Sequence, residues 1–404
     1  MLNNSSKLSD ISFNHMSNVG LVLIASHCGA SLWYIDANVE RESSKAIQSL
    51  CQACPKLRAI SLWNDSFDMD GDEIIQTIVQ CCPFIQLMST FSWRLSDTSL
   101  NALASIHTLK QLQLAYGHTN AAVQPLLRAN PDLVSLSLTV VDDALVRCIG
   151  RCCGHLERLK LGDVDHPAYC SSALMELFCG CPLLESFHLH QHGGMSNAAL
   201  RALFEHCHGL TELQLVFKQP TVPSLIAEPV LYVPFPTLTK LWVANHGLPI
   251  SALRDIFTYC TNLREVCLTC CKQVSDEILI TLVQNCKSLD TLCLASCKIV
   301  TIAGLVAVPT YCTSLRVLVL IYMSVNDKIL LELSLNCRSL TRLSLLHCTS
   351  GPLTEAGVLT VLEGCTGLTL LAIHCSEPDS ITPTLNLAKL KELYPHITFD
   401  ITGM

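Results

Sequence analysis

A short leucine pattern recurs along this chain and constrains its fold more than any other feature. The pattern Leu-x-x-Leu-x-Leu, with Val or Ile also found in the middle, begins at Leu57, Leu109, Leu133, Leu156, Leu210, Leu263, Leu289, Leu315 and Leu340. Weaker copies begin at Leu8, Leu32, Ile85, Leu184, Leu238 and Leu368, with a degenerate copy near Ile397. The mean interval is about 26 residues, a length typical of stacked structural repeats.

Between these copies lies a second pattern with helical spacing. Leu279, Leu282, Val283 and Cys286 fall at i, i+3, i+4 and i+7, which places them on one face of a helix. Hydroxyl residues followed by acids, Ser275 before Asp276 and Thr354 before Glu355, predict helix starts. Each repeat is therefore expected to be a short strand, a turn and a helix. Because one such unit cannot bury its apolar face alone, the units are expected to stack into a solenoid.

The repeats between Cys260 and Cys375 carry a family resemblance. Their form, C-x-x-L-x-x-L-x-L-x-x-C-x-x-(V/I)-(S/T)-(D/E), resembles the cysteine-containing leucine-rich repeats. Such repeats are typical of F-box/leucine-rich-repeat proteins, the substrate receptors of SCF-type cullin–RING ubiquitin ligases. We therefore expect residues 1–404 to form a single α/β leucine-rich-repeat solenoid, or horseshoe, of about 15–16 repeats. Parallel strands would line its concave face and helices its convex face.

Cysteine supplies 24 of the 404 residues, and most cysteines occupy fixed places in the repeat. Ten lie three residues before the first leucine: Cys54, Cys82, Cys153, Cys181, Cys207, Cys260, Cys286, Cys312, Cys337 and Cys365. A second set, Cys271, Cys297 and Cys348, shares its place with Met16 and Met323. A repeat position that is occupied by either Cys or Met indicates a buried apolar side chain and not a metal ligand.

One C-x-x-C pair, Cys267 and Cys270, has the spacing of a metal site. In an extended strand their Cα atoms would lie about 10 Å apart, too far for the convergent ligands of zinc. No metal and no cofactor are therefore expected. Because neither Cys267 nor its neighbour Cys293 has a cationic residue beside it on its own strand, strong nucleophilicity is not implied.

Strand alternation predicts which side chains face the concave side. From Trp242 to His374 the predicted concave positions are apolar and nearly uncharged. An exposed apolar strip usually marks an interaction site. The residues predicted to bind a protein or peptide there are Trp242, Cys267, Cys293, Val319, Ile321 and Leu346, with Trp63 and Phe91 as aromatic anchors in the amino-terminal half. The alternative is that the carboxy-terminal tail of the chain covers the strip.

Two segments depart from the repeat, and one histidine group needs an interpretation. Residues 218–236 are rich in proline and predict an irregular insert, either a protruding loop or a degenerate repeat. Residues 376–404 are expected to form a carboxy-terminal cap or tail. His188 and His190 could share a metal, but no third ligand is visible, so surface or packing histidines are the preferred interpretation.

Composition and missing motifs narrow the function. The net charge of −8 and the lack of a Lys/Arg run argue against nucleic acid, and no apolar run is long enough for a membrane span. No phosphate-binding, dinucleotide-binding or hydrolase motif is present, so an enzyme is not expected. The many cysteines and the lack of a secretory signal favour a reducing compartment, the cytoplasm or nucleus.

The amino terminus leaves two function classes open. An F-box, which docks the Skp adaptor and through it the cullin, needs about 40 residues before the repeats. Here the first repeat already begins at Leu8. Either the chain is part of a longer F-box protein, or it acts as a stand-alone scaffold or regulator with no ligase link.

Overall fold

The computed structural model describes most of the chain, in two compact units. The described residues are 9–29, 31–40, 42–63, 69–90, 93–114, 119–139, 141–162, 170–191, 193, 195–218, 229–245, 248–348, 353–374 and 387–402. Unit 1 comprises residues 1–191 and 205–209, and unit 2 comprises residues 192–204 and 210–404. The division passes through helix α8 (Asn197–His206).

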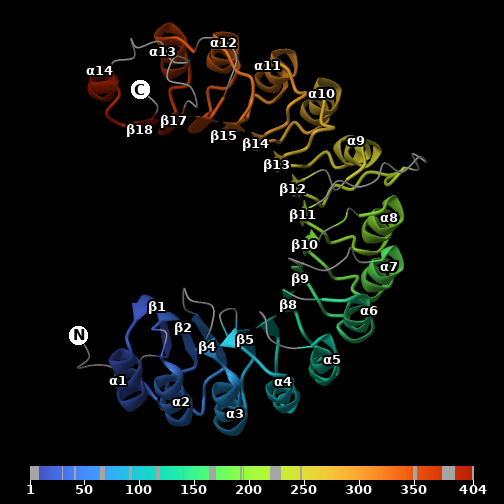
Figure 1. Ribbon diagram of the computed structural model, residues 1–404. Helices are drawn as coiled ribbons and strands as arrows, with labels where there is room; N and C mark the ends of the chain where they lie inside the picture. Colours follow the sequence, from blue (N-terminus) through green and yellow to red (C-terminus); the bar gives the residue numbers. More distant parts are fainter. Residues whose placement is uncertain are drawn as a thin grey trace. The chain divides into compact units, whose positions relative to one another are not determined.

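Unit 1 alternates strands and helices along the chain (Figure 1). Its main strands are β1 (Asp10–Met16), β2 (Tyr34–Val39), β3 (Ala59–Trp63), β5 (Leu87–Thr90), β7 (Gln111–Leu114), β8 (Ser135–Leu138), β9 (Arg158–Leu161) and β10 (Ser186–Gln191). Its helices are α1 (Asn18–Cys28), α2 (Ser44–Ala53), α3 (Asp72–Cys81), α4 (Asp97–Leu103), α5 (Asn120–Ala129), α6 (Asp143–Cys152) and α7 (Ser171–Gly180). A small parallel pair, β4 (Met69–Asp70) and β6 (Trp93–Arg94), accompanies the main strands.

Unit 2 repeats the same arrangement. Its strands are β11 (Glu212–Phe217), β12 (Lys240–Ala244), β13 (Glu265–Thr269), β14 (Thr291–Ala295), β15 (Val317–Ile321), β16 (Arg342–Leu346), β17 (Leu370–His374) and β18 (Thr398–Thr402). Its helices besides α8 are α9 (Ile250–Tyr259), α10 (Asp276–Asn285), α11 (Ile302–Tyr311), α12 (Asp327–Asn336), α13 (Glu355–Gly364) and α14 (Leu387–Leu393). In each unit the main strands pair in parallel and in chain order, with the helices on one side of the sheet (Figure 1).

The core between sheet and helices follows from the leucine pattern. In β14, Leu292 and Leu294 are fully buried, whereas Cys293 between them is only half-buried. From the facing helix α10, Leu279, Leu282 and Val283 are buried as well. Outside residues 218–236, the predicted alternation of strand, turn and helix is confirmed in the described repeats, and so is the α/β solenoid class. That the whole chain forms one continuous solenoid stays a prediction.

The cysteines at the helix ends are buried packing residues, as predicted, and they also form hydrogen bonds. Each follows the last residue of a helix, and its backbone N–H closes that helix, as Cys286 does on Leu282. Several of these thiols also donate to a carbonyl of the preceding repeat: Cys286 Sγ lies 3.4 Å from Cys260 O, and Cys337 Sγ lies 3.5 Å from Cys312 O. Burial raises the pKa of the Cys286 thiol to about 12, so this group stays protonated.

The second cysteine set fills the turn that leaves each strand. The residue after the strand has a positive φ of 53–62° in five successive repeats of unit 2: Asn245, Cys270, Ser296, Tyr322 and His347. This left-handed conformation turns the next side chain inward. Cys271, Cys297 and Cys348 are buried there, and the Cys297 thiol donates to Leu268 O at 3.5 Å. Cys270 is thus a turn residue, and no group of three metal-binding side chains occurs among the described residues.

Aspartates at helix starts connect neighbouring repeats. Asp276, the first residue of α10, accepts hydrogen bonds from the backbone N–H and the hydroxyl of Thr301 at 2.7 and 2.6 Å. Thr301 in turn caps α11, since its hydroxyl accepts from Ala303 N–H. The predicted helix starts at Ser275 and Thr354 are confirmed, and the Thr354 hydroxyl accepts from Gly357 N–H. The Ser275 hydroxyl, in contrast, accepts no N–H of α10.

The first copy of the repeat pattern differs from expectation, whereas the degenerate copy near Ile397 forms a strand as predicted. Phe13, the third apolar position of the copy that begins at Leu8, is exposed, and the pairing of β1 with β2 shifts register between Phe13 and Met16. At the other end, β18 pairs with β17 in parallel, with Asp400 beside Ala372. This part of the tail therefore extends the sheet instead of folding over it.

The described part of the proline-rich segment, residues 229–236, contains no helix and packs against its neighbours. Phe235 is buried in the place that cysteine takes in other repeats, and its ring meets Phe204 edge-on at a centroid distance of 5.0 Å. Val230 N–H donates to Asp255 Oδ2 at 2.7 Å. Among the described residues no helix is long and apolar enough to cross a membrane.

Candidate binding surface

The open face of each sheet, the face away from the helices, carries the predicted site residues. In unit 2 two columns of side chains run across the strands on this face. The first column contains Gln214, Trp242, Cys267, Cys293, Val319, Ser344, Ala372 and Asp400, each beside the next in register. The second column contains Ala244, Thr269, Ala295, Ile321, Leu346 and His374.

Within these columns, six predicted residues form what we call the unit 2 strip: Trp242, Cys267, Cys293, Val319, Ile321 and Leu346. Trp242 is 39% exposed, and its indole N–H donates to Glu265 Oε1 at 2.9 Å. The other five side chains are partly exposed, while Ser344 beside them is buried. The strip is a continuous apolar surface because parallel strands bring equivalent side chains about 4.8 Å apart.

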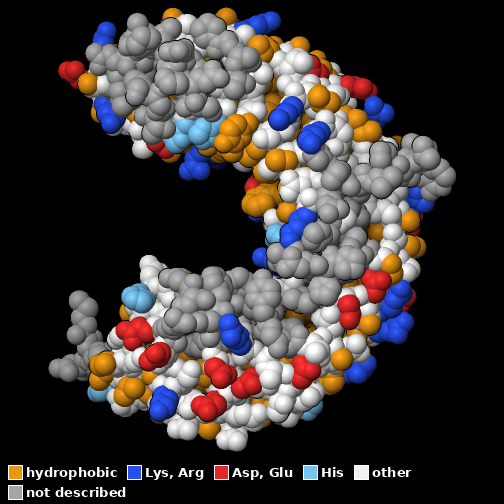
Figure 2. Space-filling model, in the orientation of Figure 1, with side chains coloured by type: hydrophobic (Ala, Val, Ile, Leu, Met, Phe, Trp, Pro, Cys, Tyr) orange, Lys and Arg blue, Asp and Glu red, His pale blue; other side chains and the backbone are white. Residues whose placement is uncertain are grey.

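Aromatic and histidine side chains border the strip where the strands end. Tyr322, exposed in its left-handed turn, stacks on the ring of His347 with centroids 5.0 Å apart and planes at 16°. His347 lies edge-on to His374, and His374 Nε2 is 3.1 Å from Asp400 Oδ1. Figure 2 shows histidine and hydrophobic side chains next to one another on the sheet side of unit 2. An apolar surface with a polar, aromatic border has the composition of a protein interface.

The two half-buried cysteines of the strip differ in acidity. Cys267 and Cys293 face each other across β13 and β14. A hydrogen bond from the Cys293 thiol, with a smaller contribution from the Thr269 hydroxyl, lowers the pKa of Cys267 to about 7 against opposing burial. The same pairing raises the pKa of Cys293. From the sequence, only cationic residues on the same strand were considered, whereas the group that lowers the pKa of Cys267 is a thiol on the neighbouring strand.

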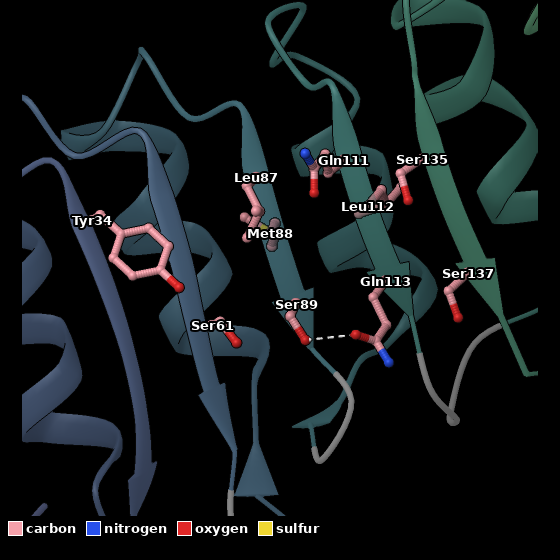
Figure 3. A pocket seen from close by; sticks show the side chains of 10 residues that line it. All are labelled: Tyr34, Ser61, Leu87, Met88, Ser89, Gln111, Leu112, Gln113, Ser135 and Ser137. Atoms are coloured by element: carbon pink, nitrogen blue, oxygen red, sulfur yellow. Dashed lines mark hydrogen bonds between the residues drawn. The ribbon is translucent and has the colours of Figure 1, made fainter. Parts of the chain in front are cut away.

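The open face of unit 1 is polar. Ser61, Ser89, Gln113 and Ser137 are neighbours across β3, β5, β7 and β8, and they line a hollow of about 240 Å³ with Tyr34 (Figure 3). The Ser89 hydroxyl donates to Gln113 Oε1 at 3.0 Å. This surface offers hydroxyls and amides instead of apolar side chains.

Of the two aromatic residues predicted as anchors in unit 1, Trp63 is among the described residues and Phe91 is not. Trp63, at the end of β3, is 38% exposed on the open face, one position beyond the polar column. Phe91 lies outside the described residues. Trp93, which the sequence interpretation did not single out, is buried, and its indole N–H donates to Leu62 O at 2.9 Å.

The histidines of β10 extend the polar face. His188 lies beside Lys160 in register, and its Nε2 is 3.2 Å from the Ser186 hydroxyl. Burial, followed by the nearby charges of Lys160 and His188, lowers the pKa of His190. Because His188 lies beside Lys160 and hydrogen-bonds Ser186, we assign these histidines to the polar surface. His192 lies outside the described residues.

Tyr322 and His347 were not identified from the sequence as site residues, because only their position after the strand, and not their residue type, indicates that they border the strip. The sequence pattern places them in turns, where any residue type can occur. Only the left-handed backbone at these positions turns the side chains along the border of the strip. A search for large residues immediately after the strand pattern would have found them.

Comparisons with known proteins bear on the fold. No family model and no curated protein matches the sequence. The structure of the Toll–Spatzle complex of Drosophila is 12% identical, with a TM-score of 0.50, over 97% of this chain and 50% of that chain. The chain has the leucine-rich-repeat fold. It spans about half of the Toll chain, and the likeness shows the fold alone.

Two further solved structures are less similar. The TLR13–ssRNA13 complex is 14% identical over 91% of this chain and 62% of that chain, with a TM-score of 0.47. The yeast Rad7–Elc1 complex is 16% identical over 81% of this chain and 86% of that chain, with a TM-score of 0.41. The function is therefore argued from the surfaces described above.

Proposed function

We propose that this chain is a protein-binding leucine-rich-repeat module whose partner lies on the unit 2 strip. The observation that carries the proposal is the continuous run of partly exposed side chains on the open face of the unit 2 sheet: Trp242, Cys267, Cys293, Val319, Ile321 and Leu346. Burying such a surface against a partner releases about 25 cal/mol per Å² of apolar area. The chain contributes binding and no chemistry of its own.

The geometry of the strip favours an extended or helical protein segment with apolar side chains. The two columns run perpendicular to the strands, so a ligand lying across β12–β16 meets a new side chain at each strand. Trp242 at one end and the Tyr322–His347 stack along the border supply large aromatic surfaces. Aromatic residues of this kind dominate the binding energy of many interfaces.

We further propose substrate recognition for an SCF-type cullin–RING ubiquitin ligase, in the cytoplasm or nucleus. The support is the cysteine-containing repeat, whose two cysteine places are both buried in the structure. In this role the module holds a substrate near the ligase and raises the effective concentration of its lysines. The second candidate is a stand-alone scaffold or regulator that binds its partner without a link to a ligase.

Affinity purification of the native full-length protein, followed by mass spectrometry, separates these two roles. A ligase receptor retains the Skp adaptor and a cullin together with its substrate. Repeated purification of a substrate without either ligase subunit contradicts the ligase role and supports the scaffold.

Charge substitutions test the strip itself. Val319→Glu and Ile321→Glu place a carboxylate in the apolar surface and are expected to weaken partner binding by about tenfold or more. Leu335→Glu is the matched control, because Leu335 is an exposed apolar residue on the helix side of unit 2, on α12. All three variants should keep the helical circular dichroism of the parent. Equal binding by all three places the partner elsewhere.

A further inference from the structure

A second surface, on unit 1, combines exposed aromatic rings with two exposed cations that form no ion pair with the described acidic side chains. It is formed by three successive turns, which follow α1, α2 and α3 (Figure 1). Ser31 and Trp33 come from the first turn, Lys56 and Arg58 from the second, and Phe84 from the third. Together they line a hollow of about 560 Å³ that we call the turn pocket.

The backbone holds these side chains in a fixed order. Leu32, Leu57 and Ile85 are fully buried, so the residues beside each of them point outward. Arg58 N–H donates to Trp33 O at 2.8 Å, which places the two residues side by side at the start of neighbouring strands. Because the surface is built on paired strands, little order must be created when a ligand binds.

The two cations of the turn pocket differ from cations in the equivalent turns of unit 1 in that they form no ion pair with the described acidic side chains. Two repeats further along, Lys110 pairs with Asp132 at 2.9 Å, and His155 lies 3.7 Å from the same carboxylate. Lys56 and Arg58 are exposed, and no acidic side chain among the described residues forms an ion pair with either. In a chain with a net charge of −8, two adjacent unpaired cations mark a place for external carboxylates.

The aromatic rings supply the apolar part of the surface. Trp33 is 41% exposed and Phe84 is 56% exposed, on either side of the two cations. Exposed aromatic rings next to arginine have the composition of interface hot spots. The same rings can hold an aliphatic or aromatic side chain while the cations bind the charges that flank it.

We propose that the turn pocket binds an acidic protein segment in which carboxylates flank a large apolar side chain. The apolar side chain packs between Trp33 and Phe84, and the flanking carboxylates pair with Lys56 and Arg58. Nucleic acid fits less well, because two cations neutralise few phosphates and the chain as a whole is acidic. This site lies in the turns of unit 1, and the proposal does not depend on the unit 2 strip.

Fluorescence anisotropy with defined peptides tests the proposal on the full chain. The probe is a fluorescein-labelled peptide of sequence GDEFEDG, compared with GNQFQNG, which lacks the charges, and GDESEDG, which lacks the ring. We expect saturable binding of the first peptide only, weakened by added salt. A short labelled oligouridine is included as the polyanion control.

Matched variants locate the binding. Arg58→Glu and Trp33→Ala are expected to weaken binding of GDEFEDG by about tenfold or more. Arg316→Glu is the control, because Arg316 is exposed in the equivalent turn place of unit 2. Equal binding by Arg58→Glu and Arg316→Glu, binding of GNQFQNG as tight as that of GDEFEDG, tighter binding of the oligouridine, or no saturable binding of GDEFEDG each overturns the proposal.

Discussion

The two units have the same kind of repeat and the same kind of leucine core, but the open faces of their sheets differ. Equivalent positions carry Ser89, Gln113 and Ser137 in unit 1 and Cys267, Cys293 and Val319 in unit 2. Beneath both faces the inward leucines are buried to the same degree. Folding therefore constrains the inward positions, while the open face is free to vary with the ligand that it meets.

The apolar face of unit 2 needs an explanation that the polar face of unit 1 does not. Single exposed apolar side chains are common on proteins, but a continuous row of them is not. The described part of the tail, β18, adds a strand beside β17 and leaves the strip uncovered. A partner protein bound on the strip, as proposed, would remove this surface from water.

The largest expected effect tests whether the two cores are equivalent. Leu136→Ala in unit 1 and Leu292→Ala in unit 2 each remove a buried inward leucine and should each lower the free energy of unfolding by about 2–5 kcal/mol. Urea unfolding followed by circular dichroism measures both, with the exposed Leu335→Ala as control. A change below about 1 kcal/mol in only one unit contradicts the equivalence of the cores.

The next largest effect is expected for the reactivity of Cys267, a residue of the unit 2 open face with no counterpart among the described residues of the polar face of unit 1. With a pKa near 7 instead of 9.0, about half of the Cys267 thiol is ionised at pH 7, against about one per cent for an ordinary thiol. Thiolate increases as pH rises, so alkylation by iodoacetamide should accelerate from pH 6 to 8 and then level off. Peptide mapping should identify Cys267 as the first residue labelled.

Variants of the neighbouring cysteine separate the hydrogen bond from simple exposure. Cys293→Ala removes the donor and should move the pH profile of Cys267 toward higher pH. Cys293→Ser keeps a donor and should shift the profile less. Identical profiles for the two variants mean that the neighbouring thiol does not activate Cys267.

A smaller effect is expected for the aspartate–threonine hydrogen bonds that connect neighbouring repeats in both units. Asp97 in unit 1 accepts from the N–H and hydroxyl of Thr119, as Asp276 does from Thr301 in unit 2. Replacing either aspartate by alanine should lower the free energy of unfolding by about 1–2 kcal/mol, because two hydrogen bonds to a carboxylate are lost. Thermal or urea unfolding of both variants compares them directly, and a loss in one unit alone would show that the connection is not general.

The smallest effect is expected on the open face itself. Ser137→Val in unit 1 and Val319→Ser in unit 2 exchange the character of equivalent positions. Because these side chains lie outside the core, each change should alter the free energy of unfolding by about 0.5 kcal/mol or less. A loss comparable to that of Leu292→Ala would mean that the open face is part of the folding core.

The features that recur in every repeat could be predicted from the sequence, whereas features that depend on contacts in a single repeat could not. Inward leucines and helix-end cysteines recur with a fixed period, so their burial could be predicted. The burial of Trp93 could not, because it depends on a short strand pair outside the repeat. The acidity of Cys267 and the turn pocket were also missed, since each depends on side chains from neighbouring repeats that are far apart in the chain.

Site-specific photocrosslinking in cells tests the central claim most directly. A benzoyl-phenylalanine is placed at position 319 or 346 in the strip, at 113 on the polar face, or at 335 on the helix side. The account predicts that one defined protein crosslinks from 319 and 346 and not from 335. Crosslinks to that protein from 335 or 113 only, or no crosslink from the strip, would contradict the assignment of the unit 2 strip as the binding surface.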